Sequence, residues 1–333
     1  MRHLFRALPL WALLLGVTSC DKEDIVAGGN GAEASGERVP MTFTALAPQS
    51  GQTQTRTELQ PGVEGEDGQT TYAVYWNAED EIGVYDGQSF QRFTIQDEME
   101  EGETAATANF SGEASADAES YLAFYPYSEG LTYTDGAIGF TLPDTQTAQA
   151  GSFASGVNPA WAQTTEAGGQ LTFHNAAALV KFTLKAEDAA QVSNAVLTDT
   201  QGKPLAGGFS LSVAAGGATL TGNSGNTSAS VKLDGNFEMK AADDPTADYL
   251  FVVACGENQL ESGFTLAFNL TNGGQKTLTA SDGLGAEKSL EAGVITNLGE
   301  IPFASVPVTG VPISFGGESS AIAAIGEETI WAD

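Results

Sequence analysis

The sequence has few basic residues: 13 Lys and Arg face 43 Asp and Glu, and the formal net charge is -30 over 333 residues. Proteins that bind nucleic acid use Lys and Arg to neutralise phosphates and release counterions. The composition therefore excludes nucleic acid as a partner. Such an acidic excess favours solubility outside a cell, and acidic runs such as Glu79-Asp80-Glu81 are expected to be solvated loops.

Apolar runs long enough to span a membrane are also absent. The N-terminal run Leu8–Val17 has about 10 residues, whereas a membrane-spanning helix needs roughly 20. It follows Arg2 and Arg6 and leads into Thr18-Ser19-Cys20, which is the pattern of a lipoprotein signal peptide over residues 1–19. Cleavage would remove both arginines, change the formal charge from -30 to -32, and leave an acylated Cys20 tethering the protein to a membrane. An ordinary secretory signal with an incidental cysteine is the alternative.

Cysteine and histidine are scarce. Beyond the signal peptide the chain has only Cys20, Cys255 and His174, too few for a zinc cluster. Because lipidation would remove Cys20 from thiol chemistry, no internal disulfide is expected either. A Ser-His-Asp triad would depend on His174, which lies on an expected strand with no nucleophile elbow in the sequence. Cys255 ends an apolar run and is expected to be a small buried thiol. We therefore predict no enzymatic activity, no cofactor and no metal; no carboxylate pair is singled out for hydrolysis.

Alternation of apolar and polar residues is the strongest structural signal. Strands with one buried face are expected wherever apolar residues recur at every second position. The clearest sets are Met41, Phe43 and Ala45; Ile138, Phe140 and Leu142; Val180, Phe182 and Leu184; Phe209, Leu211 and Val213; and Phe264, Leu266, Phe268 and Leu270. Turn-forming pairs such as Asp135-Gly136 separate them, and no long stretch shows helical spacing. The fold class is therefore all-β, built from antiparallel β-sandwiches.

Length and composition suggest how the chain is divided. A flexible acidic spacer covers residues 20–38, and a mature length of 314 suggests two domains. A polar segment near residue 187 separates an N-terminal sandwich, 39–187, from a C-terminal sandwich, 188–302. Residues 303–333 form a tail with two apolar segments. The tail is either a final strand pair of the second domain or a segment that pairs with another subunit.

Several segments together resemble the fimbrillin family, the Mfa-like subunits of type V pili on the outer membrane of anaerobic Gram-negative bacteria. The resemblance runs from about residue 39 to residue 301. Its carriers are Thr55-Arg56-Thr57, Tyr75-Trp76 before Asp80-Glu81-Ile82-Gly83-Val84-Tyr85, Tyr121-Leu122-Ala123-Phe124-Tyr125-Pro126-Tyr127, Leu171 to Phe182, and Leu290 to Leu298. Asp21-Lys22-Glu23-Asp24 after Cys20 is also similar to the acidic signal that exports such lipoproteins to the surface.

The resemblance implies two transthyretin-like (Ig-like) sandwich domains in tandem and a structural subunit of a cell-surface fimbrium. A surface protease specific for arginine would remove an N-terminal strand, and the C-terminal strand of another fimbrial subunit, a copy or a paralogue, would replace it. Arg56 and Arg38 are the candidate cleavage sites, with Arg56 favoured because that cut releases Met41–Leu46. The candidate donor residues are Val306, Val308, Val311, Ile313 and Phe315, and, nearer the end, Ile322, Ile325, Ile330 and Trp331.

A second function remains open from the sequence. A lipid-anchored surface adhesin, or a tip or anchor of a pilus, would bind glycan or host protein without polymerising. Its contacts would be aromatic rings beside turns, for which Tyr125, Tyr127, Tyr133 and Trp161 are candidates, although core packing is the commoner role of such rings. A polymer needs the C-terminal tail, whereas an adhesin does not.

Overall fold

The computed structural model describes most of the chain after residue 35. The described residues are 36–46, 58–59, 63–64, 70–71, 74–97, 99, 103–185, 192–214, 217–235, 237, 247–284, 289–302, 308–309, 311–315, 318–325 and 328–330. Cys20, Arg56, Val306 and Trp331 lie outside them. Within these ranges the chain forms strands and no helix, and thus no helix suited to crossing a membrane. The predicted all-β class is confirmed.

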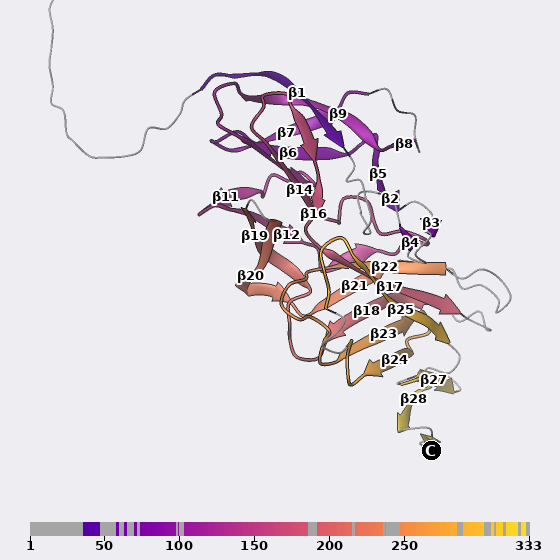
Figure 1. Ribbon diagram of the computed structural model, residues 1–333. Coiled ribbons are helices and arrows are strands. Elements are labelled where there is room, and N and C mark those ends of the chain that lie inside the picture. The colour runs from indigo at the N-terminus through magenta and orange to yellow at the C-terminus, as the bar shows by residue number, and fades with distance from the viewer. Residues whose placement is uncertain are drawn as a thin grey trace, which may run out of the picture. The chain divides into compact units, whose positions relative to one another are not determined.

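The largest sheet contains the N-terminal strand. Figure 1 labels β1, β9, β7, β6, β14 and β16 of this sheet. Its order is β15-β1-β9-β7-β6-β10-β14-β16. These strands are β1 Arg38–Leu46, β6 Glu81–Tyr85, β7 Phe90–Ile95, β9 Thr107–Ser115, β10 Tyr121–Tyr125, β14 Ala160–Thr164, β15 Gln170–Thr172 and β16 His174–Asn175. Three short strands beside it, β2 Glu58–Leu59, β5 Val74–Asn77 and β8 Thr104–Ala105, form a separate sheet, and β3 Val63–Glu64 pairs with β4 Thr70–Thr71.

Three further sheets contain most of the remaining strands. One has the order β11-β12-β19-β20, the second β13-β21-β18-β23-β24-β26 and the third β22-β17-β25. Their strands are β11 Thr132–Thr134, β12 Ala137–Leu142, β13 Thr145–Thr147, β17 Ala178–Lys185, β18 Val192–Asp199, β19 Ala206–Ala214, β20 Gly217–Ser228, β21 Ser230–Asp234, β22 Ala247–Val253, β23 Phe264–Leu270, β24 Gln275–Ala280, β25 Ile295–Pro302 and β26 Val308–Thr309.

Buried side chains form three cores. The first lies on one face of the eight-stranded sheet, where alternate residues of β1, β6, β9 and β10 surround Trp76. The second joins the other face of β10 to β12, β19 and β22. The third lies between the β22-β17-β25 sheet and the six-stranded sheet. Alternation along β12 and β23 places one side of each strand in a core, as the sequence predicts. The β17 strand differs, because Leu179 packs in the second core while Val180 and Phe182 pack in the third.

The turn between β11 and β12 is built as its sequence predicts. Thr134 pairs with Ala137, so only Asp135 and Gly136 form the loop. Their φ angles are 53° and 78°, in the left-handed region that Gly and Asp enter most readily. This primed two-residue turn matches the twist of the strands it joins.

Strand pairing continues across the expected boundary near residue 187. The strands β12, β13 and β17 precede it, and they pair with β19, β21, β22 and β25, which follow it. The β17 strand is antiparallel to β22 and parallel to β25. A division into 39–187 and 188–302 would therefore separate paired strands, and it stays a prediction.

The described residues of the tail form four strands. The β26 strand pairs with β24 at the edge of the six-stranded sheet through Gln275↔Thr309 and Lys276↔Val308. The next three, β27 Val311–Phe315, β28 Glu318–Ile325 and β29 Glu328–Ile330, pair in sequence order with one another. Within the described pairings, the tail is thus joined to the preceding sheets through β26 alone.

One glutamine side chain connects β13 to the edge of β22. Gln146 is 2% exposed, and its amide donates to Val252 O at 2.7 Å while its carbonyl accepts from Val252 N at 3.0 Å. The side chain thereby pairs with a backbone as a neighbouring strand would. Gln146→Ala leaves both Val252 groups unpaired in the interior, so we expect a loss of about 2–3 kcal/mol in the free energy of unfolding by urea titration. An effect below that of an exposed control such as Gln163→Ala would contradict this role.

Candidate functional site around strand β1

The β1 strand fills a position between two others. It pairs antiparallel with β9 along all nine residues, from Arg38↔Ser115 to Leu46↔Thr107, and parallel with β15 over three residues. Figure 1 shows β1, the first described strand, beside β9. The predicted displaced segment Met41–Leu46 lies entirely within this strand.

The side chains of β1 that face inward complete the first core. Phe43 is fully buried, with its ring centroid 5.5 Å from that of Phe93 and 5.2 Å from that of Tyr121. Ala45 is fully buried as well, and its carbonyl accepts a hydrogen bond from Trp76 Nε1 at 3.3 Å. Without β1, an apolar hollow would be exposed to water, and the Trp76 indole would lose its hydrogen bond to Ala45 O.

The outward side of β1 is polar. Thr42 Oγ1 and Ser111 Oγ share a hydrogen bond of 2.6 Å, and Thr44 Oγ1 donates to Asn109 Oδ1 at 2.9 Å. These cross-strand pairs stabilise the register of β1 on β9. The strand is therefore amphipathic, with its apolar side inward and its polar side toward solvent.

An ion pair fixes the beginning of β1. Arg38 Nε donates to Asp86 Oδ2 at 2.8 Å, and the Asp86 side chain is fully buried. That carboxylate also accepts from the backbone N–H groups of Ser115, Ser89 and Gln88 at 3.1, 3.2 and 3.2 Å. Burial alone would raise the pKa of Asp86, but the Arg38 bond and these three N–H donors outweigh it and lower that pKa.

The low pKa of Asp86 gives a defined pH dependence. A carboxyl group whose pKa is lower in the folded chain stabilises it above the unfolded-state pKa, and this contribution disappears as the pH falls through the folded-state pKa. We expect Asp86→Asn to lower the free energy of unfolding by about 2 kcal/mol at neutral pH and by much less near pH 2. Denaturant titrations at several pH values measure this; a difference that does not change with pH would contradict it.

Arg38 and Arg56 differ in what the structure describes. Arg38 is the first residue of β1, held by the backbone ladder with β9 and by Asp86, and its Nη2 donates to Ser89 Oγ at 2.9 Å. A protease that inserts an arginine side chain into its own pocket would first have to break these bonds. Arg56 lies between β1 and β2, outside the described residues.

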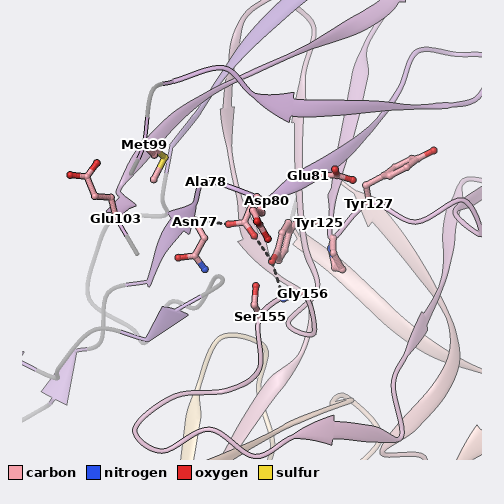
Figure 2. A pocket seen from close by; sticks show the side chains of 12 residues that line it. Asn77, Ala78, Asp80, Glu81, Met99, Glu103, Tyr125, Tyr127, Ser155 and Gly156 are labelled. Atoms are coloured by element: carbon pink, nitrogen blue, oxygen red, sulfur yellow. Dashed lines mark hydrogen bonds between the residues drawn. The ribbon is translucent and has the colours of Figure 1, made fainter. Parts of the chain in front are cut away.

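A pocket of about 720 Å3 is lined by residues that include Asn77, Asp80, Tyr125 and Ser155. Tyr125 belongs to the same core as Phe43. Figure 2 shows the Asp80 carboxylate and the Tyr125 hydroxyl directed toward each other, with Gly156 beyond the hydroxyl. Tyr125 Oη donates to Asp80 Oδ1 at 3.0 Å and accepts from Gly156 N at 3.1 Å. Burial and then the Asp80 charge raise the pKa of Tyr125, so the ring stays neutral.

Asp80 corrects one expectation from the sequence. The run Glu79-Asp80-Glu81 is not a solvated loop throughout, because Asp80 is 6% exposed and closes a tight turn. Its Oδ2 accepts from Asn77 N at 2.7 Å, and Asp80 N donates to Asn77 O at 3.1 Å. Aspartate is favoured in turns because its side chain bonds to nearby backbone N–H groups. Glu81 then begins β6 and pairs with the exposed Arg92.

The four aromatic candidates for a glycan contact have different environments. Tyr125 is 1% exposed and Trp161 is 9% exposed, so both belong to cores, while Tyr127 is partly buried. Tyr133 is 38% exposed, and its ring centroid lies 4.5 Å from that of Tyr85. Of the four rings, Tyr133 is therefore the one with a broad surface for a ligand.

The two residues considered for nucleophilic chemistry have structural surroundings. His174 is exposed on β16, the edge strand, with its ring 5.0 Å from that of Trp161. Cys255 is 7% exposed, which confirms the buried thiol, and burial followed by the charge of Glu291 raises its pKa to about 12. Such a thiol is protonated at neutral pH and a poor nucleophile. Among the residues that the structure describes, no group of three or more His, Cys, Asp or Glu could hold a metal ion.

Comparisons with known proteins give similar solved structures only. No family model and no curated protein matches the chain. A "putative cell adhesion protein" from Bacteroides ovatus ATCC 8483 is 17% identical, covering 88% of this chain and 100% of that one, with a TM-score of 0.47. A fimbrial protein from the same organism is 12% identical over 70% and 46%, with a TM-score of 0.32. A fimbrial assembly protein from Parabacteroides distasonis ATCC 8503 is 8% identical over 86% and 95%, with a TM-score of 0.33.

Proposed function

We propose that this chain is a structural subunit of a cell-surface fimbrium, tethered to the outer membrane through Cys20 and assembled by strand exchange. The observation that carries the proposal is β1 itself. It is an N-terminal strand that completes both a sheet and a core, with Phe43 enclosed between Phe93 and Tyr121. In this scheme β1 is the strand that leaves, and the groove between β9 and β15, here called the β1 groove, accepts a donor strand.

The physical reason for exchange is the state of the protein after β1 leaves. Nine residues of β9 would lose their partners, and the hollow left by Phe43 and Ala45 would fill with water. An open edge with unpaired N–H and C=O groups binds extended segments, and an apolar hollow selects those with alternating apolar side chains. A donor strand restores both contributions, so a vacated β1 groove favours assembly.

Cleavage after Arg56 suits this scheme better than cleavage after Arg38. Arg56 follows β1 in the chain, so a cut there separates β1 from everything C-terminal to it. A cut after Arg38 would leave Val39 to Leu46 attached and in place. An arginine-specific protease on the cell surface is thus a partner of this proposal.

The tail is the proposed donor to another subunit. In β27, Val311, Ile313 and Phe315 alternate with the same period as Met41, Phe43 and Ala45 in β1. The residues Val308, Ile322, Ile325 and Ile330 lie on β26, β28 and β29. A tail that enters a groove on the next subunit makes a head-to-tail contact, which does not close on itself and generates a filament.

The first experiment tests whether β1 leaves. The chain from residue 21 to residue 333 is cut with an arginine-specific protease, its new N-terminus is mapped, and a labelled peptide of residues 36–47 is added in excess. We expect the peptide to replace the cleaved strand in the wild type and in Arg38→Ala, but not in Arg56→Ala. A cut protein that keeps its own strand and admits no peptide under mild destabilisation would refute strand exchange.

A second candidate function, glycan binding by a surface adhesin, rests on Tyr133. Its exposed ring beside Tyr85 offers an apolar face of the kind that stacks on sugars. Binding to a glycan array that is lost in Tyr133→Ala and kept in Thr134→Ala, an exposed neighbour on β11, would support this function. If the protein binds no glycan on the array but exchanges its strand with the peptide, the results would support the fimbrial subunit and not the adhesin.

A further inference from the structure

The ion pair at the beginning of β1 determines what an incoming strand must supply. Asp86 belongs to the part of the sheet that remains, whereas Arg38 belongs to the strand that leaves. Strand exchange, on which this inference rests, would therefore remove the cation and leave the buried carboxylate at one end of the β1 groove. Figure 1 places this end at the start of β1, where the chain enters the sheet.

The Asp86 carboxylate would lose its cation but keep its backbone donors after Arg38 has left. Three backbone N–H groups, from Gln88, Ser89 and Ser115, still donate to it, and such bonds favour the ionised form. A second carboxylate, Asp117, lies near the same corner, since a Cβ placed on Gly36 would be 3.7 Å from Asp117 Oδ2. The end of the vacated groove is thus a fixed negative site.

The candidate donor segments of this chain provide no positive charge. Residues 303–333 contain no Lys, Arg or His, and they include Glu318, Glu327, Glu328 and Asp333. The register can be compared directly. If Val311, Ile313 and Phe315 took the places of Met41, Phe43 and Ala45 in the same direction, Val308 would take the place of Arg38. A second copy would therefore place an apolar side chain against the Asp86 carboxylate.

We propose that the β1 groove accepts its donor from a different subunit, one whose donor strand carries Lys or Arg at the register position opposite Ser115, and not from a second copy of this chain. The tail of this chain then enters the groove of another partner. The fimbrium would place this chain next to an unlike subunit on its acceptor side. Charge at one register position would select that neighbour, as like and unlike charges do at other interfaces.

Peptide binding to the chain cleaved after Arg56 tests the proposal. The probes are the 36–47 peptide, the same peptide with Arg38→Lys, Arg38→Gln or Arg38→Glu, the tail peptide 304–316, and that tail peptide with Val308→Arg. We expect the Arg and Lys forms to bind with similar affinity, and the Gln form to bind about tenfold more weakly, which is about 1.4 kcal/mol. The Glu form should bind more weakly still, and Val308→Arg should strengthen the tail peptide by about tenfold.

The reciprocal variant separates a charge effect from a general loss of packing. In the cleaved Asp86→Asn chain, the Arg, Gln and unmodified tail peptides should bind with nearly equal affinity. Failure of every peptide to bind the wild-type chain would refute strand exchange itself. Two outcomes would overturn the selection by charge while still supporting strand exchange. In the first, the 36–47 peptide and its Arg38→Gln form bind with equal affinity. In the second, the unmodified tail peptide binds as tightly as the 36–47 peptide. The peptide series decides the matter even if Asp86→Asn does not fold.

Discussion

Replacing Phe43 with alanine is expected to lower the free energy of unfolding by about 3–5 kcal/mol, the range measured when a buried Phe is truncated. Phe43 is fully buried, and the rings of Phe93 and Tyr121 contact it from two sides. The loss combines the transfer of a large apolar side chain with the cavity that a closely packed core cannot close. Urea titration followed by tryptophan fluorescence measures it, because Trp76 lies in the same core.

Thr42→Ala provides the matched control on the same strand. Thr42 faces outward, is exposed, and makes one hydrogen bond to Ser111, so its truncation should cost less than about 1 kcal/mol. The difference in unfolding free energy between Phe43→Ala and Thr42→Ala tests which side of β1 faces the core. It also separates that effect from a general weakening of the strand. Equal losses at both positions would mean that β1 is not held by its inward side chains. In the exchange assay, a 36–47 peptide with Phe43→Ala should bind far more weakly than one with Thr42→Ala.

Local pattern was sufficient to predict β1 and most one-sided strands. Met41, Phe43 and Ala45 alternate in the sequence, and the structure buries Phe43 and Ala45 fully and Met41 in part. Burial of one face of a strand depends only on neighbouring residues, so a period of two is visible in the sequence alone. The β10 strand does not alternate, because all its residues from Tyr121 to Tyr125 are buried between two cores.

The polar residues of the site could not be predicted in this way. Arg38 and Asp86 are 48 residues apart, and Gln146 and Val252 are 106 apart. Only the arrangement of the sheets brings such pairs together, and the periodicity of neighbouring residues carries no information about it. The burial of Asp80 could not be predicted for a related reason. An acidic run in the sequence indicates a solvent-exposed loop, but hydrogen bonds from Asn77 N and Tyr125 Oη offset the cost of burying this carboxylate. The sequence marks Arg38 only as a candidate cleavage site, and its ion pair with Asp86 gives it a second role.

Deleting residues 303–333 is expected to abolish donation of this chain to other fimbrial subunits while changing its own stability little. Within the described pairings, the tail is joined to the preceding sheets through two residue pairs between β24 and β26, and the rest of its pairing is internal. Loss of the backbone hydrogen bonds of these two residue pairs should cost about 1 kcal/mol. Unfolding titrations of the shortened chain measure its stability, and heat-sensitive ladders on SDS gels of fimbriae from producing cells measure its donation to other subunits.

The two readouts separate the alternatives that the sequence leaves open for the tail. A final strand pair of the second sandwich would make the deletion strongly destabilising, because it would uncover part of a core. A donor strand leaves the shortened chain folded and able to accept a peptide in its β1 groove, yet missing from the ladders as a donor. The Arg56→Ala chain is the complementary control, since it keeps its tail but should not open its groove. A shortened chain that still joins ladders from both ends would show that neither apolar segment of the tail is the donor.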